Sequence, residues 1–232
     1  MKLVLCGVAF LAAALIGAER LSAASTTAQV SALEGKASRA RNGPPAALSI
    51  GAAVGQGDTI STEPESRLEL KFSDASIIRI GSKAKLQLTE AHFGGGPTKR
   101  KLTAKLFFGN LWAKVTSAIQ GDAKFAVETE NAVAGVRGTV FRVDARDDKS
   151  VLVSVYDGAV AVAKPGAAAA KPGERHEVDG PQEISRDTWE KIVGAQMQVL
   201  ISADGTPGEP TALTPDSDDA FAKWNEERDK KK

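Results

Sequence analysis

The residues of this chain that could carry out acid–base chemistry, nucleophilic attack or metal binding do not form a recognisable catalytic pattern. His92 and His176 are the only histidines, and neither has a second ligand nearby at the spacing of a zinc site, which needs three or four ligands. The serines lie in segments with strand or turn character and lack a nucleophile-elbow motif. The sequence therefore predicts no metal, no other cofactor and no catalytic residue.

Paired carboxylates are the remaining route to catalysis, because two of them can act as general acid and general base. The acidic residues in strand-like segments are Glu69, Asp74, Asp144 and Asp157. We interpret them as exposed strand and turn residues. The protein is accordingly expected not to be an enzyme.

Two features have the chemistry of a binding site. Lys99, Arg100 and Lys101 form, together with Lys105, a basic stretch that could engage acidic groups of peptidoglycan, phospholipid headgroups or a negatively charged partner. The alternative is an ordinary solvated charge cluster beside a glycine-rich loop. Trp112 would mark a binding patch if it were exposed. If it is not exposed, it belongs to a second core layer or lies under a C-terminal helix.

Arg137 stands in an unusual setting, because Gly135 and Gly138 interrupt an alanine and valine run around it before an alternating strand begins. Glycine permits backbone angles and close approaches that a side chain forbids, so this arginine is expected at a tight entry into a sheet. Its five N–H donors need acceptors if the region is buried. We favour a buried arginine that ties strand ends together; contact with a partner protein or an anionic ligand is the alternative.

Segments of alternating polarity run from Gln29 to Asp179 and predict an all-β domain. Period two is typical of half-buried strands. The segments are 67–72, 85–89, 101–106, 124–128 and 150–155. Turn signals separate them at intervals that suit either a sandwich-like or a solenoid-like stack of short antiparallel strands.

The N-terminal segment has the pattern of a secretory signal peptide. Lys2 precedes an apolar run that ends before Glu19, and the small residues 22–24 offer cleavage sites. We therefore assign residues 1–24 as a signal peptide and expect export to the periplasm. An uncleaved anchor is disfavoured because the run is shorter than the ~20 residues of a membrane span.

The exported chain has neither cysteine nor net charge. Cys6 is the only cysteine, so no disulfide can form and stability must come from packing. Without Lys2, Arg20 and Glu19, the 30 basic and 29 acidic residues of the whole chain become 28 of each. A neutral chain has no global field that attracts polyanions, so nucleic acid is not expected as a partner.

The C-terminal part changes from period two to helical spacing. Apolar residues recur at three and four positions between Trp189 and Leu200, and Asp187 and Glu190 are spaced as a capping box, which predicts a helix near 187–199 within a helical extension over 181–203. A Gly/Pro/Thr linker over 204–216 follows. Residues 217–232 are acidic early and basic late, as the helix dipole favours, and predict a charged terminal helix.

Several motifs, in order, resemble the FecR family. The matching segments are Gly57–Thr62 (Gly-Asp-Thr-Ile-Ser-Thr), Leu70–Ser76 (Leu-Lys-Phe-Ser-Asp-Ala-Ser), Gly135–Phe141 (Gly-Val-Arg-Gly-Thr-Val-Phe), the valine-rich Val151–Val162 and Pro172–Glu174. The hallmark residues, to which we assign a structural role, are Gly135, Val136, Arg137, Gly138, Thr139, Phe141, Asp157 and Gly158. Ala75 departs from the family's usual glycine, which predicts either a turn without a left-handed residue or mild strain.

The resemblance covers residues 29–180 and implies a compact, twisted, solenoid-like β domain. The closing pattern Phe221-x-x-Trp224-x-x-x-Arg228-Asp229 is also similar to the ends of some exported FecR-like proteins. In family members that regulate iron uptake, the periplasmic domain receives a signal from an outer-membrane transporter and passes it through a membrane helix to a segment that controls a sigma factor. Neither that internal helix nor that segment is recognised here.

The resemblance implies a noncatalytic periplasmic module that binds and signals. Its expected partner is an envelope protein or peptidoglycan, and no stable membrane span is expected after removal of the signal peptide. Two other interpretations remain open. The protein could be an accessory that docks on a separate transmembrane regulator, or it could bind or hydrolyse an envelope polysaccharide.

Overall fold

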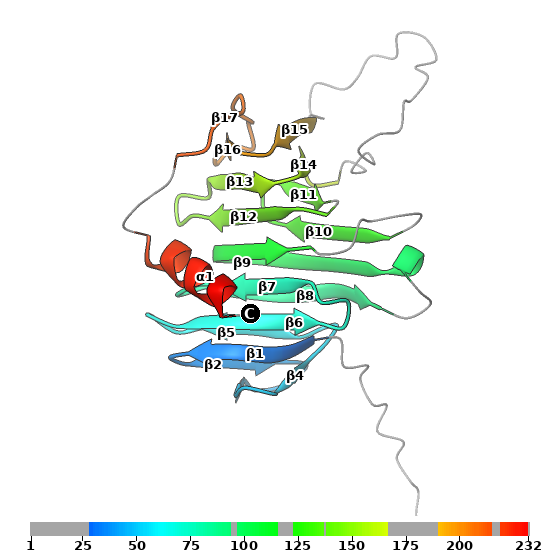
Figure 1. Ribbon diagram of the computed structural model, residues 1–232, viewed down its shortest axis with the longest axis vertical. Coiled ribbons are helices and arrows are strands. Elements are labelled where there is room, and N and C mark those ends of the chain that lie inside the picture. The colour runs from blue at the N-terminus through cyan, green and yellow to red at the C-terminus, as the bar shows by residue number, and fades with distance from the viewer. Residues whose placement is uncertain are drawn as a thin grey trace, which may run out of the picture.

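The computed structural model describes residues 28–93, 97–115, 123–136, 138–166, 190–214 and 219–231. Within these ranges the chain forms seventeen strands and one α-helix at its C-terminal end, which confirms the predicted all-β fold (Figure 1). The predicted signal peptide lies outside the described residues. None of the described segments is a helix long and apolar enough to cross a bilayer.

The strands stack as rungs in two facing sheets, called sheet A and sheet B below. Sheet A has the spatial order β4 (Ala53–Val54), β1 (Ala28–Glu34), β6 (Arg67–Phe72), β7 (Ile77–Ile80), the second half of β9 (Lys101–Lys114), β12 (Val140–Ala145), β13 (Val151–Asp157), β16 (Met197–Ile201) and β17 (Thr211–Ala212). Sheet B has the order β3 (Ala46–Ala47), β2 (Ala37–Ala40), β5 (Thr59–Thr62), β8 (Lys85–His92), the first half of β9, β10 (Lys124–Glu128), β11 (Val133–Val136), β14 (Ala159–Ala163) and β15 (Glu190–Gly194). These pairings are antiparallel except for the parallel pair β9–β10.

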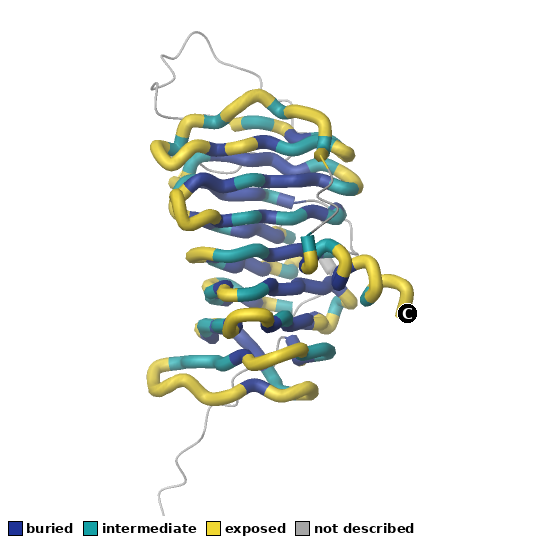
Figure 2. Tube along the Cα trace, turned by 90° about the vertical axis from the view of Figure 1, so that its left-hand side faces the viewer, coloured by how far each residue is buried: buried dark blue, intermediate teal, exposed yellow. Residues whose placement is uncertain are grey.

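An aliphatic core fills the space between the two sheets. Strand β12 illustrates the pattern, because Phe141, Val143 and Ala145 are buried while the residues between them are less so. This period-two alternation is what a strand with one core face requires. Figure 2 shows buried segments along the rungs and exposed segments at the turns.

The chain passes repeatedly from one sheet to the other, and a residue with positive φ lies at these corners. Among the described residues the corner positions are Gly35, Gly51, Gly57, Glu65, Lys83, Gly109, Gly138, Gly158 and Gln196. Gly109 lets the single strand β9 change sheets: its φ is 89°, and a Cβ there would collide with Ala84. Glycine at this corner is therefore required by sterics as well as by backbone conformation.

From β5 onwards, the corners between the sheets change side at β9. Before it, the corners at Glu65 and Gly109 lie on one side of the stack, linked through the hydrogen bond from Glu65 N to Ser82 Oγ and the contact of Gly109 with Ala84. After β9, the corners at Gly138 and Gly158 lie on the other side, since β12 starts opposite Lys114 and ends opposite Gly109. On the side of Glu65 and Gly109, the strands after β9 are joined by hairpin turns within each sheet, β10–β11 in sheet B and β12–β13 in sheet A. These turns do not cross between the sheets, so the gap between the sheets is open there.

The helix predicted near 187–199 is wrong where the chain is described, because residues 190–201 form β15 and β16. Val193 and Val199 point into the core, whereas Ile192 and Leu200 are 54% and 42% exposed. The apolar spacing of three and four fits this pair of short strands as well as it fits a helix. The turn at Gln196, with a φ of 59°, breaks the helical period, and the β-branched residues favour strands.

The terminal helix predicted within 217–232 is confirmed as α1 (Ala220–Lys230). The segment predicted as a linker contributes the two-residue strand β17 at the edge of sheet A. Ala75 has a φ of 65°, so the turn between β6 and β7 carries the backbone strain that was one of the two expectations for this position.

Candidate functional site

Trp112 is covered and is not part of an exposed binding patch. It projects from the outer face of sheet A with only 5% of its surface exposed, and it packs with Ile77, Phe221 and Trp224. The last two residues belong to α1, which lies across this face (Figure 1). The prediction of an exposed binding patch at Trp112 is therefore wrong. The alternative, that Trp112 lies under a C-terminal helix, is correct.

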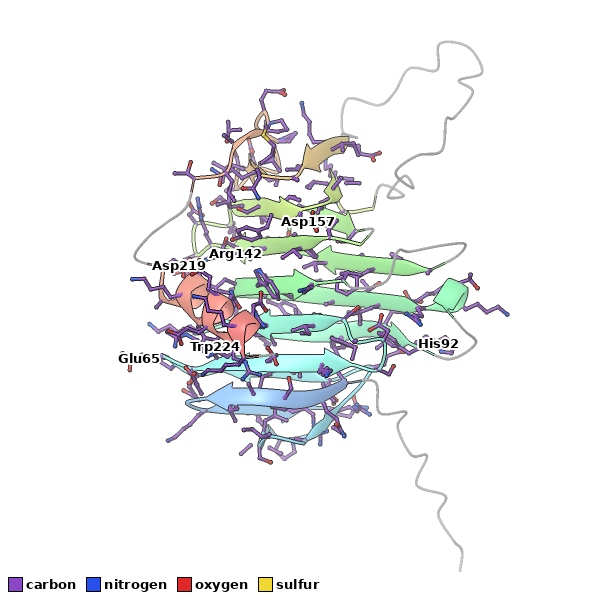
Figure 3. All side chains as sticks on the ribbon, viewed as in Figure 1. Glu65, His92, Arg142, Asp157, Asp219 and Trp224 are labelled. Atoms are coloured by element: carbon purple, nitrogen blue, oxygen red, sulfur yellow. The ribbon has the colours of Figure 1, made fainter. Side chains whose placement is uncertain are left out.

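The basic stretch lies at the far end of sheet B from α1. Lys99 ends a 3-10 turn (Pro97–Lys99), and Lys101 starts β9 opposite His92, which Figure 3 labels on the side away from α1. Lys99 and Lys101 are exposed, but a guanidinium nitrogen of Arg100 lies 3.5 Å from the Asp74 carboxylate. Arg100 is therefore engaged within the chain, whereas Lys99 and Lys101 stay accessible.

The glycine and arginine motif forms a corner between the sheets. Arg137 itself lies outside the described residues. Gly138 has a φ of 62°, and Thr139 is buried beside Gly158 of the next corner, where a Cβ would lie 2.6 Å from Thr139 Cγ2. These positions stack on each other between β11–β12 and β13–β14, so close packing of backbone explains the glycines.

The remaining described residues of the motif lie in the strands beside these corners. Gly135 and Val136 lie in β11, and Phe141 is fully buried with its ring in edge contact with Phe125. Asp157 is exposed at the end of β13. The described members of the motif are thus placed by packing, and they do not gather around a pocket.

The most elaborate polar cluster lies between sheet A and α1, and it centres on Arg79. Strand register places Arg79 between Glu69 on β6 and Trp112 on β9, and the guanidinium carbon is 4.4 Å from the Trp112 ring centroid. Arg79 Nε is 2.8 Å from Glu69 Oε2. Since Arg79 is 0% exposed, each of its charged hydrogen bonds is shielded from water.

Helix α1 completes the coordination of this buried arginine. Arg79 Nη2 lies 2.7 Å from Asp229 Oδ1, and Nη1 donates to the backbone carbonyl of Asn225 at 3.0 Å. Arg228 reaches the other oxygen of Glu69 at 2.8 Å. The pair Glu69–Arg79 on the sheet is therefore matched by the crossed pair Arg228–Asp229 on the helix.

A second ionic cluster holds the start of the helix. Arg142 on β12 pairs with Asp144, at 2.8 Å, and with Asp219, the N-cap of α1. The same Asp219 carboxylate accepts hydrogen bonds from the backbone N–H groups of Phe221 and Ala222 at 2.7 and 3.0 Å. Figure 3 shows Arg142, Asp219 and Trp224 together at α1. One carboxylate thus starts the helix and ties it to the sheet.

The clusters fix the protonation of their carboxylates. Burial would raise the pKa of Glu69, but hydrogen bonds from Arg228, Arg79 and Ser31 outweigh it and lower the pKa to about 2. Burial also opposes ionisation of Asp219, yet the hydrogen bond from Arg142 and the N–H groups of α1 hold its pKa below the usual value. Both groups are ionised at neutral pH, and they act as fixed charges that bind the helix.

Three of the four carboxylates expected to be exposed are engaged. The Asp74 side chain, 8% exposed, pairs with Arg100 and accepts hydrogen bonds from Ser76 within its own turn. Glu69 is buried in the Arg79 cluster, and Asp144 is largely covered beside Arg142. The reason is α1, which covers this face of the sheet. Arg79 and Arg142, which the sequence analysis did not assign, could have been found from the Phe221-x-x-Trp224-x-x-x-Arg228-Asp229 pattern, because its members form one helix face that needs complementary charges on a strand surface.

One open pocket lies at the corner where β9 changes sheets. Phe107 and Phe108, each 43% exposed, lie beside the β10–β11 turn of sheet B and the β12–β13 turn of sheet A. Its volume is about 230 Å³. The turns supply its polar lining residues: Thr129, Glu130, Arg146, Asp147, Lys149 and Ser150. No group of three metal-ligating side chains occurs in the described part of the chain.

Comparisons with curated proteins and with solved structures give no more than a distant likeness. No curated protein matches the chain. Two crystal structures of a proposed anti-sigma factor from Parabacteroides distasonis ATCC 8503 are similar in fold, with 17% and 18% sequence identity and TM-scores of 0.49 and 0.48. The match covers 72% of this chain and 63% and 64% of those chains, so this chain spans less than two thirds of their length.

The family model described as FecR protein matches residues 58–161. The matched part begins at the corner before β5 and ends within β14, and it includes the stacked glycine corners and the open pocket. The resemblance to the FecR family that the sequence motifs indicate is therefore confirmed over residues 58–161.

Proposed function

We propose that this protein is exported to the periplasm and acts there as a noncatalytic binding and signalling module that recognises a protein or a polymer of the cell envelope. The FecR family match over residues 58–161 is the observation that supports the proposal most directly, because this family is regulatory and is not known for enzymes. The signal-peptide pattern of residues 1–24 supports export.

The distribution of surfaces supports binding as the activity. Helix α1 packs on the outer face of sheet A around Trp112, so this part of the face is covered by the chain itself and is not accessible to a partner. Two kinds of surface stay accessible, namely the strands at the end of the stack, with exposed Ile192 and Leu200, and the pocket at Phe107 and Phe108. Edge strands can recruit a partner strand, and exposed aromatic residues beside a pocket can hold a ligand.

The identity of the partner distinguishes two related roles, an accessory of a transmembrane regulator and a polymer-binding protein. An accessory of a transmembrane regulator would bind a membrane protein and relay its state, whereas a polymer-binding protein would anchor the module to the envelope. A hydrolase acting on an envelope polysaccharide would release soluble fragments, and we expect no such turnover.

The test is crosslinking in intact cells that express the full chain with a tag after Lys232, followed by identification of the captured proteins. Cell fractionation and mass determination of the mature N-terminus test export, which we expect to leave a periplasmic chain that starts near Ser25. Capture of one dominant envelope protein, or sedimentation with purified peptidoglycan, would support the proposal. A cytoplasmic full-length chain, or catalytic turnover of an envelope polysaccharide, would overturn it.

A further inference from the structure

The aromatic floor of the pocket is created by a β-bulge in β9. Lys85 pairs with Phe108 and Leu86 pairs with Leu106, so Phe107 is the extra residue of the longer strand. A bulge changes the alternation of side chains, which explains why two consecutive phenylalanines are both 43% exposed. Two adjacent exposed aromatic residues beside a pocket are uncommon on a soluble surface and indicate a binding site.

The walls of the pocket exist because the corners change side at β9. Beyond this point the near ends of the two sheets are hairpin turns, one from each sheet, and the turns leave the gap above Phe107 and Phe108 open. A hydrogen bond of 2.6 Å from the Asn131 amide to the Lys149 carbonyl joins the two turns. The Asp148 carboxylate accepts hydrogen bonds from the backbone N–H and hydroxyl of Ser150, at 2.9 and 2.6 Å. The site is thus formed before any ligand binds.

Cations without ion-pair partners surround the aromatic floor. The ammonium groups of Lys85 and Lys105 each lie 5.3 Å from the centroid of the Phe107 ring. Neither lysine forms a salt bridge with a described residue, although Glu128 lies opposite Lys105 in the strand register. The Arg146 guanidinium on the pocket wall likewise makes no salt bridge within the described ranges, although its charge also acts on the nearby carboxylates of Asp144 and Asp148. An anionic ligand would supply the missing partners.

The remaining wall residues suit hydroxyl groups. Glu130 is already paired with Lys149 at 3.1 Å on the exposed rim, and Thr129 and Asp147 add further hydrogen-bonding groups. A protein partner would need about 800 Å² of surface with an apolar centre. The outer face of sheet B around Phe107 is polar instead, as the exposed or half-buried Lys85, Gln87, Lys101 and Lys105 show. A small aromatic floor with a polar and cationic rim fits a sugar ring, which has an apolar C–H face and a hydroxyl edge.

We propose that the pocket at Phe107 and Phe108 binds a carboxylate-bearing glycan, one ring stacking on the phenylalanines and its acidic groups pairing with Lys85, Lys105 and Arg146. This inference rests on the proposed function, because it names the envelope polymer and the surface that recognises it. The same chemistry occurs in uronic-acid polysaccharides and in peptidoglycan, and the experiment separates these sources.

The test measures binding of the mature chain to oligogalacturonate by calorimetry, and to purified peptidoglycan by sedimentation, with dextran as the neutral control. We expect oligogalacturonate or peptidoglycan to bind and dextran not to bind. The variant Phe107→Ser/Phe108→Ser should weaken binding at least about tenfold, as removal of aromatic anchors usually does. Lys85→Ala/Lys105→Ala should weaken it and reduce its salt dependence. Binding of both acidic probes would indicate recognition of carboxylate-bearing glycans in general, and binding of peptidoglycan alone would identify that source.

The matched control is Ile50→Ser, which removes an apolar side chain that is 66% exposed and does not line the pocket. It should bind as the unaltered chain does, and all three variants should melt within a few degrees of it. Equal binding by the phenylalanine and lysine variants, or no binding of either acidic probe, would overturn the glycan site. Crosslinking of an envelope protein that persists in such a case would leave the broader proposed function standing.

Discussion

Arg79 Nε lies 2.8 Å from Glu69 Oε2 on the neighbouring strand, and α1 closes over this pair from more than a hundred residues further along the chain. The arginine has no exposed surface, so its charge depends entirely on the partners within the protein. The C-terminal helix provides Asp229 and the carbonyl of Asn225 among those partners. The helix is therefore an integral part of the β domain's stability.

Arg79→Ala should destabilise the protein by about 3–5 kcal/mol, because it leaves buried Glu69 and its aromatic surroundings without their central cation. For a chain of this length that corresponds to a fall in melting temperature of roughly 6–20 °C. Thermal unfolding followed by circular dichroism measures it. Arg67→Ala is the control, since it breaks an exposed pair with Glu34 and should cost at most about 1 kcal/mol. Equal losses in the two variants would contradict the central role of Arg79.

The Glu69 cluster should make stability depend on acid. The pKa of Glu69 is about 2 in the folded protein and 4.5 in its usual state, so its contribution is fully present above pH 4.5 and is lost as the pH falls towards 2. The shift corresponds to about 3 kcal/mol. Asp219 adds to the loss, because its pKa is also lowered. Asp144 opposes it, since burial raises the pKa of that carboxyl and its protonation then favours the folded state.

Urea unfolding between pH 7 and pH 2 measures this dependence. Glu69→Gln should be less stable than the unaltered chain at pH 7, because Arg79 and Arg228 lose their carboxylate. The two stability curves should converge as the pH falls, because only the unaltered chain has a Glu69 carboxylate to protonate. Curves that stay parallel throughout this range would show that Glu69 is not the titrating group.

Asp219 has two roles that different substitutions can separate. Asp219→Asn keeps an oxygen that can cap α1 but loses the charge that pairs with Arg142, whereas Asp219→Ala loses both. Loss of a cap costs about 0.5–2 kcal/mol, so hydrogen exchange of the α1 amides should accelerate most in the alanine variant and less in the asparagine variant. Asp204→Ala, which removes an exposed turn contact with Thr206, should leave the exchange of α1 unchanged. Faster exchange in the asparagine variant than in the alanine variant would contradict the capping role.

The strand part of the fold could be predicted from the sequence because core and surface residues alternate locally. The β12 residues Phe141, Val143 and Ala145 show this pattern, and the motifs around Gly138 and Gly158 place the corners. Residues 190–201 could not be assigned in this way, since their apolar residues taken together, Ile192, Val193, Val199 and Leu200, fit a helical and a two-strand spacing equally well. Pairing of β15 with β14 and of β16 with β13 decides the outcome, and that information is not local.

Which residues are exposed or buried on the outer faces of the sheets depends still more on contacts between distant parts of the chain. Trp112 lies in a strand-like segment, and only the docking of α1 determines that it is buried. Arg79 and Glu69 look like ordinary strand charges until the helix pattern at 221–229 is placed above them. Phe107 is exposed because of a bulge opposite Lys85, a register shift that the sequence of β9 alone does not reveal.

Gly158 should be difficult to replace, because sterics and backbone conformation both require glycine there. Its φ is 83°, and a Cβ would lie 2.6 Å from Thr139 Cγ2 and 2.9 Å from the Gly138 carbonyl oxygen. Gly158→Ala should therefore cost about 1–2 kcal/mol for the left-handed backbone and a further 1–3 kcal/mol for overpacking. Urea unfolding of this variant measures the sum of the backbone cost and the overpacking cost.

Gly166→Ala isolates the backbone term, because Gly166 has a φ of 86° and no described neighbour within 4 Å of the new Cβ. It should cost only about 1–2 kcal/mol. Adding Thr139→Ser to Gly158→Ala removes the nearest clashing methyl group and should restore part of the lost stability, but not all of it, because the Gly138 carbonyl oxygen remains close. Equal costs for the two glycine substitutions, with no rescue by Thr139→Ser, would mean that the corners are not held by the packing of Gly158 on Thr139.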